Sequence, residues 1–322
     1  MTTHAVRNQL SLLELAKRTT DDGNLIAIAE VLDETNDVLL DAHWQPSNQT
    51  QSHLITRRNS LPSGTWRKIN EGIAATASST TQVVEPIGLL EAYSKVDKVL
   101  VDIAANPAEF RAMEDRAFIE GLSQDLADAI IYGNAGSHPE RFNGLAVRLN
   151  DLSQSNVFDA GGSGSDVTSL YIVQWGVGRV YMVYPRNDAA LGLMARDLGE
   201  DTVLDASNNE YQAYRTHFSV KPGLAVVDER SIIRIANVET SGSTNIFDDD
   251  TLIEALNNLP YNGVGAVVYC NRTIKTQMDI RAKDKSNVNY SPAEVWGRPV
   301  MTFRGVPVRR VDAILDTETA VT

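Results

Sequence analysis

Cysteine is nearly absent from this chain of 322 residues, which contains a single one, so an internal disulfide framework is excluded. Cys270 follows Val267, Val268 and Tyr269, a pattern that predicts a small buried hydrophobic residue on a strand. A nucleophilic cysteine needs a base such as histidine, and none lies near it in the sequence. The five histidines are never three or four residues apart, so the spacing of a zinc site is also missing. We therefore expect no metal ion and no cofactor.

Long hydrophobic runs are missing too. No apolar stretch reaches the roughly 18–20 residues of a membrane helix, and residues 1–7 lack the apolar block of a secretion signal. Hydrophobic residues make up 43% of the chain and charged residues 22%, close to the averages of globular proteins. We expect a soluble protein with a sizeable core, made in a cytoplasm and without a membrane partner.

Positive charge is scarce, because 29 Lys and Arg stand against 42 Asp and Glu, and the formal net charge is −13. A strongly acidic protein does not adhere to nucleic acid non-specifically. One interpretation is simple solubility, and another is a wall that touches packed DNA without binding it tightly. The sign alternates along the chain: residues 1–45 carry eight acids and three bases, whereas residues 45–90 carry four bases and two acids. Such alternation suits complementary contacts between copies.

Catalytic motifs are absent as well. The sequence has no Gly-x-Ser-x-Gly elbow, no His-Glu-x-x-His helix and no phosphate-binding loop with its lysine. The glycine-rich stretch 160–166 lacks that lysine, so we interpret it as a flexible connector. Asp248, Asp249 and Asp250 are better explained as the first turn of an acidic helix than as a cation site. Catalytic carboxylate pairs stay open, because 42 acids allow many combinations.

A polar arm is the first positive signal. Residues 52–60 have the composition of a strand, 61–64 have turn chemistry, and 65–69 are expected to form the return strand. A two-stranded ribbon is at best marginally stable in water. We therefore predict a loop that docks on another molecule, and its basic residues are Arg57, Arg58, Arg67 and Lys68.

One long helix follows, predicted over 107–132. Asn106 is placed to cap it, Pro107 occupies its first position, Glu109 completes the cap and Gly133 ends it. Gly121 lies in the middle and predicts a close packing contact or a bend. The apolar face is predicted to comprise Phe110, Met113, Ala117, Leu122, Leu126, Ala129 and Ile130.

The remaining segments mix helices and strands. Short helices are expected at 12–18, opened by the capping box at 11–14, and at 25–32. Strand or helix character returns at 89–93, and the choice stays open there. Further along we expect strands at 170–173, 179–184, 224–227, 232–236 and 264–269, helices from 247 and at 273–281, and two short strands within 301–311.

Several strings, taken together, resemble the major capsid proteins of short-tailed and related tailed bacteriophages. They are Thr65–Gly72, Leu90–Asp97, Tyr132–Asn134, Arg141–Leu145, Tyr214–Phe218, Asn271–Thr273 and Phe303–Arg309, and they span nearly the whole chain. The resemblance implies an α+β fold of the Hong Kong 97 type. It also implies the following parts: an N-terminal arm at 1–44, an extended β-hairpin loop at 45–85, a peripheral domain at 86–150 and 291–322 with a spine helix at 107–132, and an axial domain at 151–290.

On this resemblance the function is structural rather than enzymatic. Copies are expected to assemble into hexamers and pentamers of an icosahedral shell around double-stranded DNA, held without sequence specificity. Expected partners are the portal protein, a separate scaffolding protein and, as an open alternative, a decoration protein. The expected location is the virion capsid, assembled in the bacterial host cytoplasm. The alternatives are an encapsulin-like compartment shell and a soluble enzyme with an unrecognised site.

The residues expected at the contact between copies follow from charge. We hypothesise that Arg57, Arg58, Arg67 and Lys68 meet acids of an adjacent subunit. The acidic face of the long helix, with Glu114, Asp115 and Glu120, is one candidate. Trp66 is the candidate anchor of the contact, and the alternative is that it caps its own hairpin.

Overall fold

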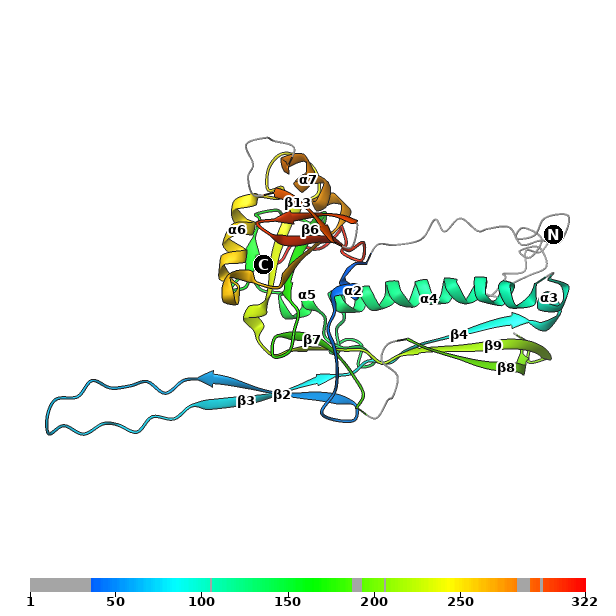
Figure 1. Cartoon of the computed structure of the whole chain (residues 1–322), viewed down its shortest axis with the longest axis horizontal. Coiled ribbons are helices and arrows are strands. Elements are labelled where there is room, and N and C mark those ends of the chain that lie inside the picture. Colours follow the sequence, from blue (N-terminus) through cyan, green and yellow to red (C-terminus); the bar gives the residue numbers. More distant parts are fainter. Residues whose placement is uncertain (1–35, 105, 187–192, 206, 283–289, 296–297) are drawn as a thin grey trace. The chain divides into compact units, whose positions relative to one another are not determined.

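The computed structural model describes residues 36–322 except 105, 187–192, 206, 283–289 and 296–297 (Figure 1). Contacts within the chain divide it into two units. One includes Leu89–Leu126 and Ala190–Lys221, and the other comprises Thr35–Gly88, Ala127–Ala189 and Pro222–Thr322. The helices expected at 12–18 and 25–32 lie outside the described residues.

The first unit is built on a three-stranded antiparallel sheet in the order β4-β9-β8. Its elements are β4 (Leu90–Asp97), α3 (Lys98–Ile103), β8 (Met194–Leu204), β9 (Glu210–Val220) and the first part of α4 (Pro107–Tyr132). One sheet face packs on α4, because Phe118 and Phe218 stack with ring centroids 6.1 Å apart. A small core gathers Val96, Leu100, Val101, Ala104 and Phe110. Because β4 covers Leu90–Asp97, the choice between strand and helix at 89–93 is decided in favour of a strand.

Helix α4 has the bounds that the sequence predicts. The Asn106 side-chain carbonyl accepts a hydrogen bond from the Glu109 backbone N–H at 3.4 Å, and the Asn106 amide donates to the Glu109 carboxylate at 3.0 Å. The helix ends at Gly133, where a Cβ would lie 2.4 Å from the Ala129 carbonyl oxygen and 2.5 Å from that of Phe142. Only glycine fits this close approach of backbone to backbone.

One expectation about this helix was wrong, and one of the two alternatives at Gly121 is excluded, whereas the other, a bend, stays a prediction. Ala117 was placed on the apolar face but is exposed, whereas Phe110, Leu122, Leu126 and Ile130 are buried as predicted. A Cβ at Gly121 would meet nothing within 4 Å, so this glycine marks no close packing contact in the described part of the chain. Helical spacing alone could not separate Ala117 from its neighbours, because alanine is small enough to occupy either face.

The second unit contains a mixed sheet in the order β13-β14-β15-β12-β6-β11-β5. Central strand β6 is buried at every position, and its apolar run at 170–173 is typical of a strand covered on both faces. Helices α6 and α7 pack on the sheet, and Leu252 and Ile274 share one core with Leu170 and Ile233 (Figure 1). The bounds are β5 (Val157–Asp159), β6 (Val167–Gln174), β11 (Ile232–Glu239), α6 (Asp249–Asn258), β12 (Ala266–Cys270), α7 (Arg272–Ala282), β13 (Tyr290–Val295), β14 (Arg298–Phe303) and β15 (Val306–Arg310).

The C-terminal tail is tied to this unit by a buried ion pair. Arg234 donates to the Glu318 carboxylate at 2.8 Å and to the Leu149 carbonyl at 2.9 Å. The same carboxylate accepts hydrogen bonds from the Tyr132 and Ser169 hydroxyls. Burial, together with the nearby Glu318 carboxylate, raises the pKa of Tyr132. The end of α4, the sheet and the tail therefore share one satisfied polar cluster.

A small sheet β1-β7-β10 and a two-stranded sheet β2-β3 complete the unit. Their bounds are β1 (Trp44–Pro46), β2 (Ser52–Ser60), β3 (Ser79–Pro86), β7 (Val180–Tyr184) and β10 (Gly223–Val226). The short helices are α2 (Val38–Asp41), α5 (Leu145–Arg148), η1 (Glu229–Ser231) and η2 (Pro260–Gly263). The strands and helices expected between residues 170 and 311 are present, with small differences at their ends.

The predicted return strand of the arm was wrong. Residues 61–78 form no strand, and β2 pairs with β3 instead, with Ser52 opposite Pro86 and Arg58 opposite Thr80. The turn chemistry at 61–64 is local, whereas pairing depends on which strand brings buried side chains to the body of the unit. Ile55 on β2 and Glu85 on β3 are both buried, and residues 65–69 have no buried position.

Two searches of the described residues had negative results. Within those residues, no helix combines the length and apolar composition needed to cross a membrane. Nor do three His, Cys, Asp or Glu side chains of the described segments gather closely enough to hold a metal ion. The Asp248 side chain accepts no capping hydrogen bond from the first turn of α6, and its carboxylate accepts one from Arg281 at 3.0 Å. Cys270 is buried on β12 as predicted, and burial raises the pKa of its thiol to about 12.

Candidate assembly interface

The β2-β3 hairpin, drawn in Figure 1, has a root and an outer part. The two parts differ sharply in burial. Near its root the hairpin packs on the second unit, where Ile55 joins Tyr181, Val183 and Ala225 in one apolar cluster. Beyond the root every residue from Arg58 to Gln82 is exposed. The chain therefore anchors the base of the hairpin and leaves the remainder without cover from the described residues.

His53 fixes the base from the β2 side. Its Nε2 lies 2.8 Å from the Tyr181 hydroxyl, and its Nδ1 accepts a hydrogen bond from the Asn48 backbone N–H at 3.3 Å. Acceptance at Nδ1 requires the neutral ring with its proton on Nε2. Burial lowers the pKa of His53, although Glu85, directly opposite on β3, raises it. The neutral ring is thus the form that fits the site.

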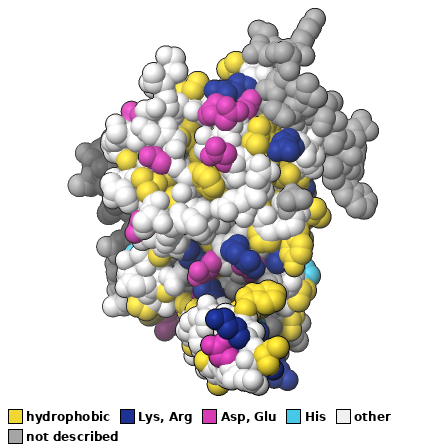
Figure 2. Space-filling model, turned by 90° about the vertical axis from the view of Figure 1, so that its left-hand side faces the viewer, with side chains coloured by type: hydrophobic (Ala, Val, Ile, Leu, Met, Phe, Trp, Pro, Cys, Tyr) yellow, Lys and Arg dark blue, Asp and Glu magenta, His cyan; other side chains and the backbone are white. Residues whose placement is uncertain are grey.

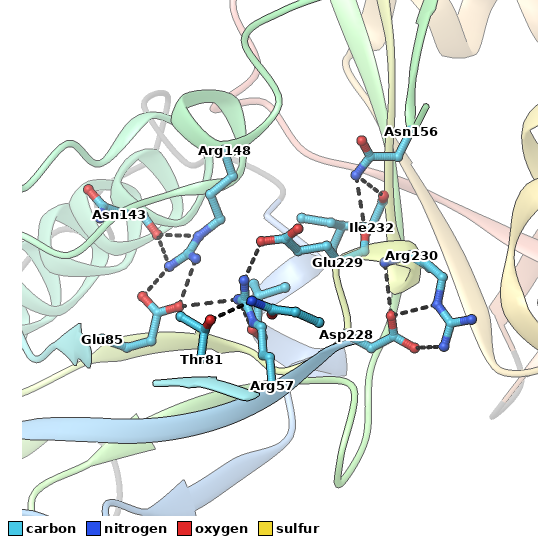
Figure 3. A network of polar contacts seen from close by, with 12 residues as sticks. Arg57, Thr81, Glu85, Asn143, Arg148, Asn156, Asp228, Glu229, Arg230 and Ile232 are labelled. Carbon is cyan, nitrogen blue, oxygen red and sulfur yellow. Dashed lines mark hydrogen bonds and ion pairs between the residues drawn. The ribbon is translucent and has the colours of Figure 1, made fainter. Parts of the chain in front are cut away.

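Glu85 fixes the base from the β3 side (Figure 3). Glu85 is 1% exposed, and its two carboxylate oxygens accept hydrogen bonds from Arg148 at 2.8 and 2.6 Å. Arg148 also donates to the carbonyls of Asn143 and Leu224, each at 3.2 Å. A bidentate arginine–carboxylate pair is strong and directional, and here it links β3 to α5 and β10.

Arg57 completes the network at the root. Its guanidinium donates to the Val226 carbonyl and to the Glu229 carboxylate, and lies 3.9 Å from Glu85 Oε1 (Figure 3). The sequence hypothesis placed Arg57 against an adjacent subunit. The structure gives it acidic partners within its own chain, so an anchoring role is observed and an interface role stays a prediction.

The outer part of the hairpin presents large apolar side chains to solvent. Trp66 is 102% exposed, and Leu61, Ile69 and Ile73 are 74%, 92% and 61% exposed. Trp66 consequently does not cap its own hairpin. Figure 2, in which the hairpin end faces the viewer at the bottom, shows hydrophobic and basic side chains together there. Exposed apolar residues gathered on one segment mark an interaction site.

The other basic candidates lie on this outer part. Arg58 is exposed on β2. Arg67 donates to the Glu71 carbonyl at 3.1 Å, and the backbone N–H of Lys68 donates to the Glu71 carboxylate at 3.1 Å. Glu71 thus shapes a local turn and leaves the Lys68 ammonium group pointing to no described partner. The structure brings the basic candidates and Trp66 onto one segment.

The acidic candidates lie on α4 in the first unit and are half-buried. Asp115 accepts a hydrogen bond from the Thr216 hydroxyl at 3.4 Å, and Glu120 accepts one from the Gln124 amide at 3.1 Å. Glu114 likewise has interactions within the chain. All three acids therefore interact within the single chain, and a contact with a second copy stays a prediction.

Sequence reasoning missed the residues that hold the root. Glu85, Arg148 and Glu229 are far apart in the sequence, and no local pattern connects them. The one available signal was an acid at the end of the apolar pair Val83–Val84, since a charge on a half-buried strand needs a partner. The identity of that partner could not be derived without the fold.

The comparisons with known proteins decide the family. The family model GP7, described as major capsid protein GP7, matches residues 20–322. The chain belongs to the GP7 family of major capsid proteins. A chain in the structure of bacteriophage Epsilon15 has 33% sequence identity to this chain. The match covers 100% of both chains and has a TM-score of 0.73. A search of curated protein sequences finds no match.

Two further solved structures are more distant. The capsid of bacteriophage JBD30 is 11% identical, covers 89% of this chain and 91% of its own, and has a TM-score of 0.49. The SrpI encapsulin of Synechococcus elongatus PCC 7942 is 13% identical, covers 72% of this chain and 98% of its own, and has a TM-score of 0.49. The family match and the Epsilon15 structure favour a phage capsid over a cellular compartment shell.

These findings confirm the main expectations from the sequence. This GP7 family member has the Hong Kong 97-type capsid fold and is a structural protein rather than an enzyme. It is the major capsid protein of a tailed bacteriophage, self-assembles into an icosahedral shell and is a component of the virion.

Proposed function

We propose that copies of this capsid protein join by laying the outer hairpin, residues 58–82, on an adjacent copy. The observation that carries the proposal is the unbroken exposure of this segment, with Trp66 fully exposed at its centre. An isolated two-stranded hairpin is marginally stable at best in water, and residues 61–78 of this segment form no strand. Its apolar side chains gain burial only when another molecule covers them, and in a shell the most abundant molecule is a second copy.

Within this contact the apolar and charged residues have different roles. Trp66 is the anchor, because large aromatic side chains contribute most of the energy of small contacts. Arg58, Arg67 and Lys68 face acids of the adjacent copy, with Glu114, Asp115 and Glu120 on α4 as one candidate surface. Each exposed ion pair contributes only ~0–1 kcal/mol, so the charges select and orient the partner.

The finer organisation of the particle follows the same proposal. Residues 1–44 are the N-terminal arm, 45–85 the extended loop, 86–150 and 291–322 the peripheral domain, and 151–290 the axial domain. Hexamers and pentamers of the chain enclose double-stranded DNA without sequence specificity. The acidic net charge supports this, because an acidic wall does not bind packed DNA tightly. Portal, scaffolding and decoration proteins are the further partners, and assembly takes place in the host cytoplasm.

Charge reversal on the outer hairpin tests the proposal. Arg58→Glu combined with Lys68→Glu changes two exposed side chains and leaves the buried root intact. We expect soluble subunits with unchanged thermal stability and few or no particles by negative-stain microscopy and sedimentation. The matched control, Arg58→Lys with Lys68→Arg, keeps both charges and is expected to assemble. Normal particles from the glutamate variant would contradict a role for these residues in the contact.

A further inference from the structure

The root of the hairpin is held by two close ion pairs that differ in their exposure to solvent, and a longer Arg57–Glu85 contact of 3.9 Å lies between them. In the Glu85–Arg148 pair the side chains are 2% and 16% exposed. In the Arg57–Glu229 pair the Arg57 side chain is 19% exposed, whereas that of Glu229 is 66% exposed. Both pairs connect the hairpin to the body of the second unit, and Figure 3 shows them side by side.

The first contact has no freedom to rearrange. Glu85 is bonded through both oxygens, and Arg148 is fixed in turn by the Asn143 and Leu224 carbonyls. Separating the pair would leave a buried charge without a partner, which is strongly unfavourable. This pair therefore acts as the fixed point of the hairpin base.

The second contact is of a different kind. Glu229 lies in the short helix η1 and reaches Arg57 from the solvent side. If Glu229 turned away, its carboxylate would simply be hydrated, and Arg57 would keep its bond to the Val226 carbonyl. The Arg57–Glu229 pair can therefore open without leaving a buried charge unsatisfied. Its restraint on the hairpin depends on the Glu229 carboxylate.

A small rotation at the root of the hairpin displaces its outer end by a large distance. The nine steps along the chain from Arg57 to Trp66 span up to ~30 Å at ~3.3 Å per residue. A rotation of about 10° at the root would therefore displace Trp66 by roughly 5 Å, which exceeds the tolerance of a packed contact. Between Arg58 and Gln82 no residue is buried on the described chain, so the root alone decides the direction of the segment.

We propose that Arg57 and Glu229 are positioning residues, which hold the hairpin in the direction required to reach the adjacent copy, while Glu85 and Arg148 form its fixed base. This inference rests on the proposed function of the outer hairpin. It assigns to Arg57 a role inside its own subunit, and it makes Glu229, which lies outside the hairpin on η1, a determinant of shell geometry.

Distance measurements on the unassembled full-length chain test the first half of the inference. Spin labels at Ser63→Cys and Ser155→Cys report the direction of the hairpin relative to the body, and both sites are exposed. Native Cys270 is fully buried, so we expect its thiol to remain unlabelled while the chain is folded. Double electron–electron resonance is expected to give one narrow distance distribution for the otherwise unchanged chain and a broad one for Glu229→Ala. Hydrogen exchange of the β2-β3 amides is expected to rise by up to about fivefold in Glu229→Ala.

Two companion variants separate positioning from a general loss of charge or stability. Glu254→Ala removes an exposed acid from α6, and its distance distribution is expected to remain narrow. Glu229→Gln retains a side-chain oxygen at the same length, and its distance distribution is expected to be narrower than that of Glu229→Ala. The melting temperature of all three variants is expected to match that of the unchanged chain, because each alters an exposed side chain.

Particle geometry tests the second half. Glu229→Ala is expected to yield particles of mixed diameter and open sheets, whereas Glu254→Ala is expected to yield uniform particles. An unchanged distance distribution in Glu229→Ala would overturn the inference, and so would equal broadening in Glu254→Ala. Broad distances with uniform particles would overturn the link to shell geometry. Failure of the proposed function would be seen separately, as normal assembly by the Arg58→Glu and Lys68→Glu variant, which leaves the root untouched.

Discussion

Truncation of Trp66 to alanine separates assembly from folding. Trp66 is 102% exposed, so the isolated subunit loses no packing when its ring is removed. Substitutions at such positions usually change the free energy of unfolding by no more than ~0.5 kcal/mol. The thermal stability of the subunit is therefore expected to stay the same, and any defect in particle formation then belongs to contacts between copies.

The size of the assembly defect follows from the area of the ring. A tryptophan buries ~150–250 Å² at an interface, which corresponds to ~4–6 kcal/mol at ~25 cal/mol per Å². Immobilisation and imperfect fit reduce this figure, and central aromatic residues typically cost ~2–4 kcal/mol when truncated. Because ~1.4 kcal/mol is a factor of ten, each contact is expected to weaken roughly 30- to 700-fold.

The threshold concentration for assembly measures this loss. Each copy contributes one hairpin, so the loss per added copy is one contact, and the threshold is expected to rise by the same factor. Light scattering over a dilution series, with sedimentation of the products, gives the threshold directly. Trp66→Phe retains most of the aromatic area and is expected to shift it far less. Assembly of Trp66→Ala at the unchanged threshold would refute the reasoning, as would a fall in subunit stability that accounts for the defect.

Two predictions concern the body of the subunit. Glu318→Ala leaves Arg234 buried without its carboxylate partner and is expected to destabilise the second unit by ~3–5 kcal/mol in denaturant unfolding, whereas Glu254→Ala on the surface of α6 is expected to change little. His53 has a lowered pKa in the folded chain, so the unfolded chain binds its proton first as the pH falls below ~6.5. Folding stability is therefore expected to decrease from pH 6.5 towards pH 5. The decrease should be smaller in His53→Gln, which keeps a polar side chain beside Tyr181, and equal slopes in the two proteins would exclude His53 as its source.

Helices and strands could be predicted from the sequence where neighbouring residues alone determine them. Helix α4 could be predicted to the residue, because Asn106, Pro107 and Gly133 act through the backbone of their immediate neighbours. The buried strand β6 was visible through its apolar run at 170–173. Strands β8 and β9 were not, because β8 is exposed at most positions and its charged residues carry no strand periodicity.

The hairpin shows where local reasoning stops. The turn-forming residues at 61–64 are real signals, but the return strand lies at 79–86 because Glu85 has a buried partner there and residues 65–69 have none. The exposed candidates Arg58, Trp66 and Lys68 were found, since a polar arm with a lone tryptophan is recognisable in one stretch of sequence. The anchoring set was not found, because each of its pairs joins residues that the fold alone brings together.

Charge explains why apolar side chains have to carry most of the contact between copies. Every copy has a net charge of −13, so two approaching copies repel each other over distances up to about the Debye length. Many arginines of the body, including Arg111, Arg148 and Arg234, are already paired within the chain. The outer hairpin offers three cations, and at ~0–1 kcal/mol per exposed pair they supply at most ~3 kcal/mol. That amount can offset repulsion locally and orient the hairpin, but it falls with added salt. Burial of Trp66 and its apolar neighbours is not screened in this way, so assembly that persists at high ionic strength is the behaviour expected of a contact anchored by these residues.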